Sequence, residues 1–298
     1  MSKLLENKGK MEYNEKNGRI AEAQAMKITH DFHVHTNLSM CAKGVAHFQG
    51  YMENFEKMGH TKVGFANHFW DNDVPIDFDS YTPRNRITRF YTEQGYDHVC
   101  QLRPEIEAYR GPVKVYFGVE GEYDPFHHGV GITEAVAEQL DFLIVPNSHT
   151  HMMMPLELYE PYEKHAEFMT NAYREIMRCP VGKYVTAMAH PFEAVCCPYP
   201  NEILMDLIPD DTYRRLFDEQ AERGIAFEVN VSYMNKLTPK EIEESRKMRL
   251  FRLAKECGCK FIFGSDAHDH ATLAHYDNAT LTAELLGLTE DDIADIAK

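Results

Sequence analysis

Seven short apolar segments alternate with segments of helical periodicity along this chain, and this alternation is what most restricts its fold. β-Strands are expected over 28–35, 61–67, 113–121, 141–146, 183–189, 225–231 and 260–264. Helices are expected over 45–57, 82–110, 132–140, 160–178, on both sides of Pro209, and over 238–258, 271–286 and 290–297. Strict alternation favours parallel strands joined by right-handed crossovers. An open doubly wound sheet and a closed barrel both fit. No glycine-rich phosphate loop follows any strand, so the barrel is favoured.

The first residues differ in character from the rest of the chain. Residues 1–27 are polar and charged, and we expect a solvated N-terminal arm that is partly helical over 19–26, followed by one barrel domain over 28–298. The arm contains no apolar stretch typical of a secretory signal. The seven cysteines are an odd number in irregular places. Together these features predict a reduced, cytoplasmic protein.

The charge of the chain bears on its partners. Lysine and arginine number 31, aspartate and glutamate 47, and the formal net charge is −16. This balance opposes binding to long nucleic acids, which depends on neutralising phosphates with cations. It does not exclude a small anionic substrate, because bound divalent metals would dominate the local field.

Ionisable residues stand at the C-terminal ends of six of the seven expected strands. They are His33 and His35, His68, Glu120, His149, His190, and Asp266 with His268. In an α/β barrel these strand ends converge on one face, where active sites lie. Core strands seldom carry ionisable residues, because burying one without a partner is costly. The pattern therefore predicts a metal centre.

Eight such ligands are too many for one ion. Zinc or manganese takes about four to six ligands, so the set suits two or three ions. Glu120 and Asp266 are the natural bridges, since a carboxylate can bind through both oxygens. A cluster of divalent ions lowers the pKa of a bound water and holds the oxygens of an in-line displacement. The residues by themselves therefore predict hydrolysis.

Six short motifs make the prediction more specific. The sequence resembles the polymerase and histidinol phosphatase family in Asp31-Phe32-His33-Val34-His35-Thr36, Asn67-His68, Gly118-Val119-Glu120, Ser148-His149, Ala189-His190-Pro191 and Gly264-Ser265-Asp266-Ala267-His268. The resemblance covers about residue 28 to the end, with the motifs in family order. It implies a distorted (β/α)7 TIM-like barrel, phosphoesterase activity and two or three divalent ions (zinc, manganese or iron). By analogy, one ion would bind His33, His35, Glu120 and Asp266, a second would bind Glu120, His149 and His190, and His68 with His268 would help hold a third.

The chain departs from the family pattern at two positions. The family usually has a further histidine six residues after the position of His35, and here that residue is Cys41. Two outcomes are open: the thiolate replaces the imidazole as a softer ligand, or the third metal position is weakened or lost. The usual Thr-Asp-His at the second strand is Ala66-Asn67-His68 here, which alters the support of His68 but not the ligand.

Catalysis and substrate binding call for further groups. His151 lies two residues after His149 and could protonate a leaving group or line the mouth of the site; Asp266 is counted as both ligand and catalytic residue. Arg84, Arg86 and Arg89 are candidate phosphate clamps. Glu228 and Asn230 resemble a family Glu-x-Asn pattern and are expected to support the barrel mouth.

Three functions are compatible with these residues. The first is a histidinol-phosphatase-like hydrolase of phosphate monoesters, in which a bridging hydroxide attacks phosphorus. The second is a phosphodiesterase or exonuclease acting on nucleotides or short nucleic acids. The third is a non-catalytic module that metal stabilises. A substrate panel and the metal content would separate them, and the sequence does not select the substrate.

Overall fold

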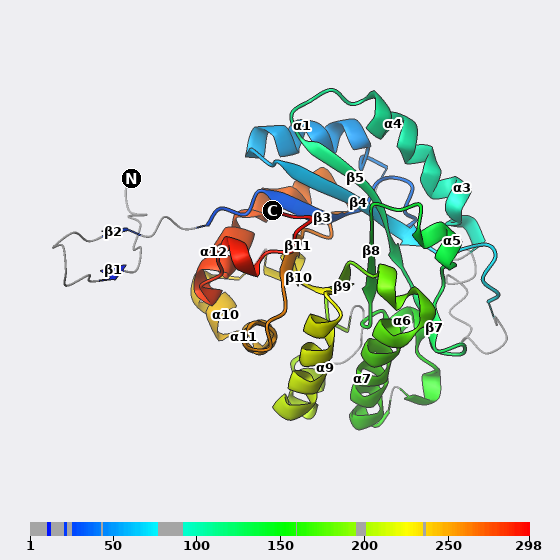
Figure 1. Ribbon diagram of the computed structural model, residues 1–298, viewed down its shortest axis with the longest axis vertical. Helices are drawn as coiled ribbons and strands as arrows, with labels where there is room; N and C mark the ends of the chain where they lie inside the picture. The colour runs from blue at the N-terminus through cyan, green and yellow to red at the C-terminus, as the bar shows by residue number, and fades with distance from the viewer. Residues whose placement is uncertain are drawn as a thin grey trace.

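Seven parallel strands form a nearly closed barrel with helices between them (Figure 1). The computed structural model describes residues 11–12, 21–22, 26–42, 44–76, 92–158, 160–194, 201–234 and 237–298. Within them the barrel strands follow one another in chain order: β3 (His30–Val34), β4 (Lys62–Phe69), β5 (Lys114–Gly121), β8 (Phe142–Pro146), β9 (Ala187–Ala189), β10 (Ala226–Asn230) and β11 (Phe261–Gly264). The two ends of the sheet meet where the His35 N–H donates to the Ala267 carbonyl at 3.0 Å. The predicted (β/α)7 TIM-like barrel is confirmed.

The barrel interior is filled by side chains from strands that are not neighbours. The Phe32 ring of β3 lies 5.3 Å from that of Phe142 on β8 and 5.1 Å from that of Tyr116 on β5, measured between centroids. The register between β3 and β4 shifts between Asp31 and Val34. Because of this irregularity two consecutive residues, Phe32 and His33, both reach groups across the barrel.

The outer helices cover the barrel with amphipathic faces. α1 (Phe48–Met58) buries Phe48, Tyr51, Met52 and Phe55 and ends at Gly59 with φ of 76°. α7 (Tyr162–Arg178), α9 (Asp210–Glu222) and α11 (Arg246–Glu256) likewise bury one apolar side. Shorter helices complete the layer: α3 (Tyr96–Val99), α4 (Arg103–Ala108), α5 (Glu134–Ala137), α6 (Thr150–Met153), α8 (Asn201–Leu207), α10 (Pro239–Glu244) and α12 (Asp277–Leu286). None of the described helices combines the length and apolar composition that crossing a bilayer requires.

Several expected elements are shorter than the sequence predicts. The fifth strand begins at Ala187 instead of residue 183, because a 3₁₀ helix occupies Pro180–Tyr184. Within 132–140 only α5 is helical, and the first part of 271–286 belongs to a 3₁₀ helix (His270–His275) that precedes α12. The described part of 82–110 contains α3, a 3₁₀ turn (Cys100–Leu102) and α4, whose first turn includes Pro104. The small hairpin of β6 (Tyr123–Asp124) and β7 (Gly129–Val130) follows β5.

Three expected helices are wrong in part. The helix over 238–258 is interrupted at Ser245, which is extended and whose hydroxyl accepts a hydrogen bond from the Met248 N–H, so that α11 begins anew. After a 3₁₀ turn (Glu290–Asp292), residues near Ile293 pair with Phe261 of β11 instead of continuing a helix. In the arm, β2 (Ala21–Glu22) pairs antiparallel with β1 (Met11–Glu12), so no helix forms at those residues.

Candidate metal centre

All nine predicted metal ligands lie at the barrel mouth in groups of ligating atoms. Within each group these atoms lie within 4.8 Å of one another. The groups are His33–Glu120–His190, His33–His35–Asp266, His68–Glu120–His149 and His35–Cys41–His68–His268. Since several residues belong to two groups, the groups form one continuous cluster. The convergence of strand ends expected from the sequence thus brings these side chains together.

Glu120 on β5 lies at the centre of the cluster. Its Oε1 is 2.9 Å from His190 Nε2, 3.5 Å from His33 Nε2 and 3.6 Å from His149 Nε2. Its Oε2 is 3.0 Å from His68 Nδ1 and 3.5 Å from His35 Nε2. The two oxygens therefore face different histidines, which is the arrangement of a carboxylate that bridges two cations.

His33 and His35 project to the same side of β3, as strand alternation predicts. Their Nε2 atoms are 3.1 Å apart. Asp266 Oδ1 lies 3.6 Å from the first and 3.3 Å from the second. Asp266 and His190 have φ values of 51° and 25°, a backbone region that costs a non-glycine residue about 1–3 kcal/mol. The fold therefore holds both residues in positions that the backbone disfavours.

In four of the histidines, Nδ1 points away from the centre of the cluster and lies within hydrogen-bond distance of a side-chain oxygen. Nδ1 of His33 lies 2.6 Å from Glu228, and Nδ1 of His149 lies 2.9 Å from Glu122. Because a carboxylate only accepts, these rings donate from Nδ1 and direct Nε2 into the cluster. Nδ1 of His190 lies 2.6 Å from the Ser148 hydroxyl, and Nδ1 of His35 lies 3.2 Å from that of Ser39. Such outer partners orient histidines that bind metals.

The charges within the cluster raise the pKa of one histidine and lower the pKa values of two carboxylates. Burial alone would lower the pKa of His33, but the charges of Glu228, Glu120 and Asp266 outweigh it and raise that pKa well above its ordinary value. Burial would raise the pKa of Glu120, yet the surrounding imidazoles hold it well below its usual range. The same opposition lowers the pKa of Glu122 to about 2. The carboxylates are therefore anionic at neutral pH.

The residues fit a group of bound cations. Glu120 Oε2 is buried, and His68 Nδ1, although 3.0 Å away, does not complete a hydrogen bond to it, an arrangement that is costly for an anionic oxygen. The Nε2 atoms of His33 and His35 face each other 3.1 Å apart, while Nδ1 of each ring lies beside an oxygen, of Glu228 and Ser39 respectively. A divalent cation would satisfy the carboxylate oxygen and bind both Nε2 atoms. Imidazole and carboxylate are suitable ligands for zinc, manganese and iron.

Sequence reasoning overlooked three supporting residues. Glu122 contacts both His68 and His149, Ser148 contacts His190, and the Ser39 hydroxyl contacts the ring of His35 and the backbone N–H of His68. Glu122 follows Glu120 by two residues, so strand alternation could have placed both carboxylates on one face. Ser148 stands in the Ser148-His149 motif, in which no role was assigned to the serine, and Ser39 carries no comparable signal. Glu228 supports the mouth as expected, through His33 and the backbone N–H of His190.

The remaining predicted residues have different outcomes. His151, in α6, is half-buried, and its ring lies 5.6 Å from that of His149 between centroids. It is thus next to the cluster without belonging to it. Arg84, Arg86 and Arg89 lie outside the described residues.

Two solved structures share this fold. One is a histidinol phosphate phosphatase from Lactococcus lactis, complexed with zinc, L-histidinol and phosphate. Its sequence is 15% identical to this chain, and the TM-score is 0.55. The match covers 87% of this chain and 94% of the Lactococcus lactis chain. The other is a proposed histidinol phosphatase from Listeria monocytogenes, 13% identical with a TM-score of 0.62 over 84% of this chain and 99% of its own. At these identities the likeness is one of fold. No family profile matches the chain, and no curated sequence is detectably similar.

Proposed function

We propose that this protein is a metal-dependent hydrolase of small phosphate monoesters, of the histidinol phosphatase type. The observation that carries the proposal is Glu120, a buried carboxylate whose two oxygens face different histidines. A non-catalytic fold has no need of so many ionisable groups at one barrel mouth. The bound zinc, L-histidinol and phosphate of the Lactococcus lactis structure favour a monoester over a diester.

Three sets of side chains would hold the ions. His33, His35 and Asp266 with Glu120 form one set, Glu120 with His149 and His190 a second, and His68 with His268 and Cys41 a third. Bound divalent ions would supply a nucleophile by lowering the pKa of water and would neutralise charge on the phosphoryl oxygens. Zinc, manganese and iron are all compatible with the first two sets.

The chain's own groups would position the reactants and move one proton. Glu120 and Asp266 would fix the spacing within the cluster, and their anionic charge would offset the cations. His151 would donate a proton to the leaving oxygen, which is the role its place beside His149 allows. Arg84, Arg86 and Arg89 are our candidates for binding the phosphate.

The test begins with protein stripped of metal by a chelator and reloaded with zinc or manganese. We expect two or three bound ions per chain and phosphate release from small monoesters, L-histidinol phosphate included. Bis(p-nitrophenyl) phosphate and a short oligonucleotide report on the diesterase alternative. Glu120→Gln should abolish turnover, and the matched control Glu284→Gln, at an exposed position of α12, should not. Full activity of metal-free protein would contradict the proposal.

A separate test addresses His151. General acid catalysis contributes about 10²–10⁴-fold, and it matters only where the leaving oxygen is a poor leaving group. His151→Gln should therefore slow hydrolysis of an alkyl phosphate by that factor and leave p-nitrophenyl phosphate nearly unaffected. Equal losses on both esters would show that His151 does not donate the proton.

A further inference from the structure

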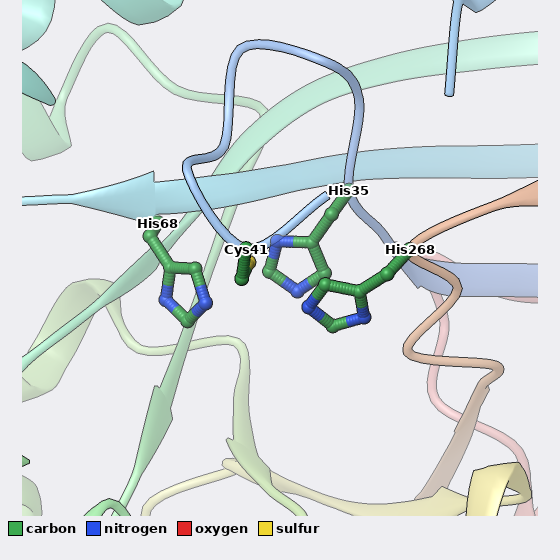
Figure 2. A group of neighbouring side chains, drawn as sticks. All are labelled: His35, Cys41, His68 and His268. Carbon is green, nitrogen blue, oxygen red and sulfur yellow. The ribbon is translucent and has the colours of Figure 1, made fainter. Parts of the chain in front are cut away.

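Cys41 lies in a group with three imidazoles and no carboxylate. Figure 2 shows its side chain between His68 on one side and the rings of His35 and His268 on the other. The rings of His35 and His268 are stacked with centroids 4.4 Å apart. Every ligating atom of this group is nitrogen or sulfur. The other three groups each contain Glu120 or Asp266.

The proton positions determine which nitrogens face the sulfur. Nδ1 of His268 is 2.8 Å from the Asp266 carbonyl oxygen, which only accepts, so Nδ1 carries the proton. Nδ1 of His68 is 3.1 Å from the Glu122 carboxylate and is protonated for the same reason. In both rings Nε2 is therefore the nitrogen that can bind a cation together with Cys41. His35 also lies 3.3 Å from Asp266 and so links this group to its neighbour.

The loop that carries Cys41 is held in place by a second unusual residue. Asn67 Oδ1 accepts hydrogen bonds from the Thr36 N–H at 2.8 Å and the Ser39 hydroxyl at 2.9 Å. The Ala42 N–H donates to the Ser39 carbonyl at 3.0 Å. The turn from Thr36 to Ala42 is thus fixed on β4, and Cys41 is positioned before any cation arrives. This preorganisation reduces the cost of binding.

We propose that Cys41, His68 and His268 form a thiolate–imidazole metal position that selects zinc over harder ions such as manganese and magnesium. The inference rests on the proposed function and deepens it, because it gives one metal position a different preference from its neighbours. Thiolate and imidazole favour zinc, whereas carboxylate and water suit manganese and magnesium. On binding, the thiol proton is released to solvent and a sulfur–metal bond forms.

Cobalt spectroscopy tests the sulfur–metal bond directly. Metal-free protein titrated with Co²⁺ should develop a thiolate-to-cobalt charge-transfer band in the near ultraviolet. Cys41→Ser should lose this band and one tightly bound zinc. Removing a residue that only supports a ligand lowers metal affinity roughly 10–100-fold. Losing the ligand itself should lower the affinity for that zinc by at least as much. Cys41→His should retain the zinc without the band.

A matched control uses Cys257, a half-buried thiol that follows α11. Cys257→Ser should keep both the band and the zinc content. A band that persists in folded Cys41→Ser protein, with folding checked by circular dichroism, would overturn the inference.

Alkylation gives a second readout that does not depend on turnover. Cys41 is exposed, so iodoacetamide should modify it in metal-free protein, as measured by mass spectrometry of the peptide. Zinc should slow this modification at least tenfold, and magnesium should not. Equal modification with and without zinc would overturn the inference. A protein that shows the band and the protection but hydrolyses no ester would contradict the proposed function and leave the metal position standing.

Discussion

Glu228 Oε1 lies 2.6 Å from His33 Nδ1, and this contact leaves Nε2 as the nitrogen of His33 that faces the cluster of candidate ligands. The other oxygen of Glu228 accepts from the backbone N–H of His190. One carboxylate from β10 therefore orients ligands on β3 and directly after β9. Both residues of the pair are buried.

Glu228→Gln should weaken metal binding about 10–100-fold, the usual effect of losing an outer partner. The amide has only one accepting oxygen, so one of the two N–H groups would face an N–H₂ group instead. Isothermal titration with zinc would measure the change, with Glu284→Gln as the charge-matched control. Unchanged affinity would show that the contact with Glu228 is dispensable for metal binding.

Gly264→Ala should also disrupt the contact between Glu228 and His33, in this case by crowding both residues. A Cβ at this position would lie 2.3 Å from Glu228 Oε1 and 2.5 Å from His33 Cβ. Overpacking of this kind typically costs about 1–3 kcal/mol of unfolding free energy, and we expect weaker zinc binding as well. Chemical denaturation and zinc titration would check both. Gly129→Ala is the control, because its Cβ would meet its nearest atom at 3.7 Å.

Metal removal should destabilise the folded chain. Ions that bind the cluster and not the unfolded chain stabilise it by about 2.7 kcal/mol at a hundredfold excess over Kd. We expect the melting temperature to fall when zinc is chelated and to recover when zinc is restored. Glu120→Ala should have a much smaller zinc-dependent change. An identical melting temperature with and without chelator would contradict the expectation.

His30 should make stability sensitive to mild acid. Burial, reinforced by His60 and Lys62, lowers its pKa from 6.5 to about 3, and its Nε2 accepts from the Phe263 N–H at 3.1 Å. Between these values the unfolded chain binds the proton and the folded chain does not, so stability falls as the pH drops below 6.5. From pH 7 to pH 5 the loss from this group is about 2 kcal/mol.

The measurement compares the wild type with His30→Gln, which keeps a hydrogen-bond acceptor but does not titrate. Urea denaturation of both proteins in chelator, at pH 7 and pH 5, separates the contribution of His30 from any effect of bound metal. The variant should lose less stability than the wild type over this interval. Equal losses would show that His30 is not responsible.

The local sequence pattern was sufficient to predict an element and the direction of its side chains where one periodicity dominated. The apolar runs around Val119, Ile144 and Phe263 predict buried strands, and the alternation of His33 with His35 predicts that their imidazoles share a side. Ser245 and Ile293 show the limit. A hydroxyl that caps a new helix and a backbone that pairs with β11 both compete with a helical pattern, and only contacts with the folded barrel decide the outcome.

By itself the sequence determined the alternation of strands with helices and the ionisable residues that stand at the strand ends, because both follow from periodicities of two to four residues. Only the tertiary structure decided which side chains at the barrel mouth contact one another. Glu228 reaches His33, Asn67 holds the loop of Cys41, and Glu122 contacts two histidines at once. These contacts join residues far apart in the chain, and their geometry depends on the curvature of the closed sheet and on the register shift in β3. Neither property is encoded in local spacing.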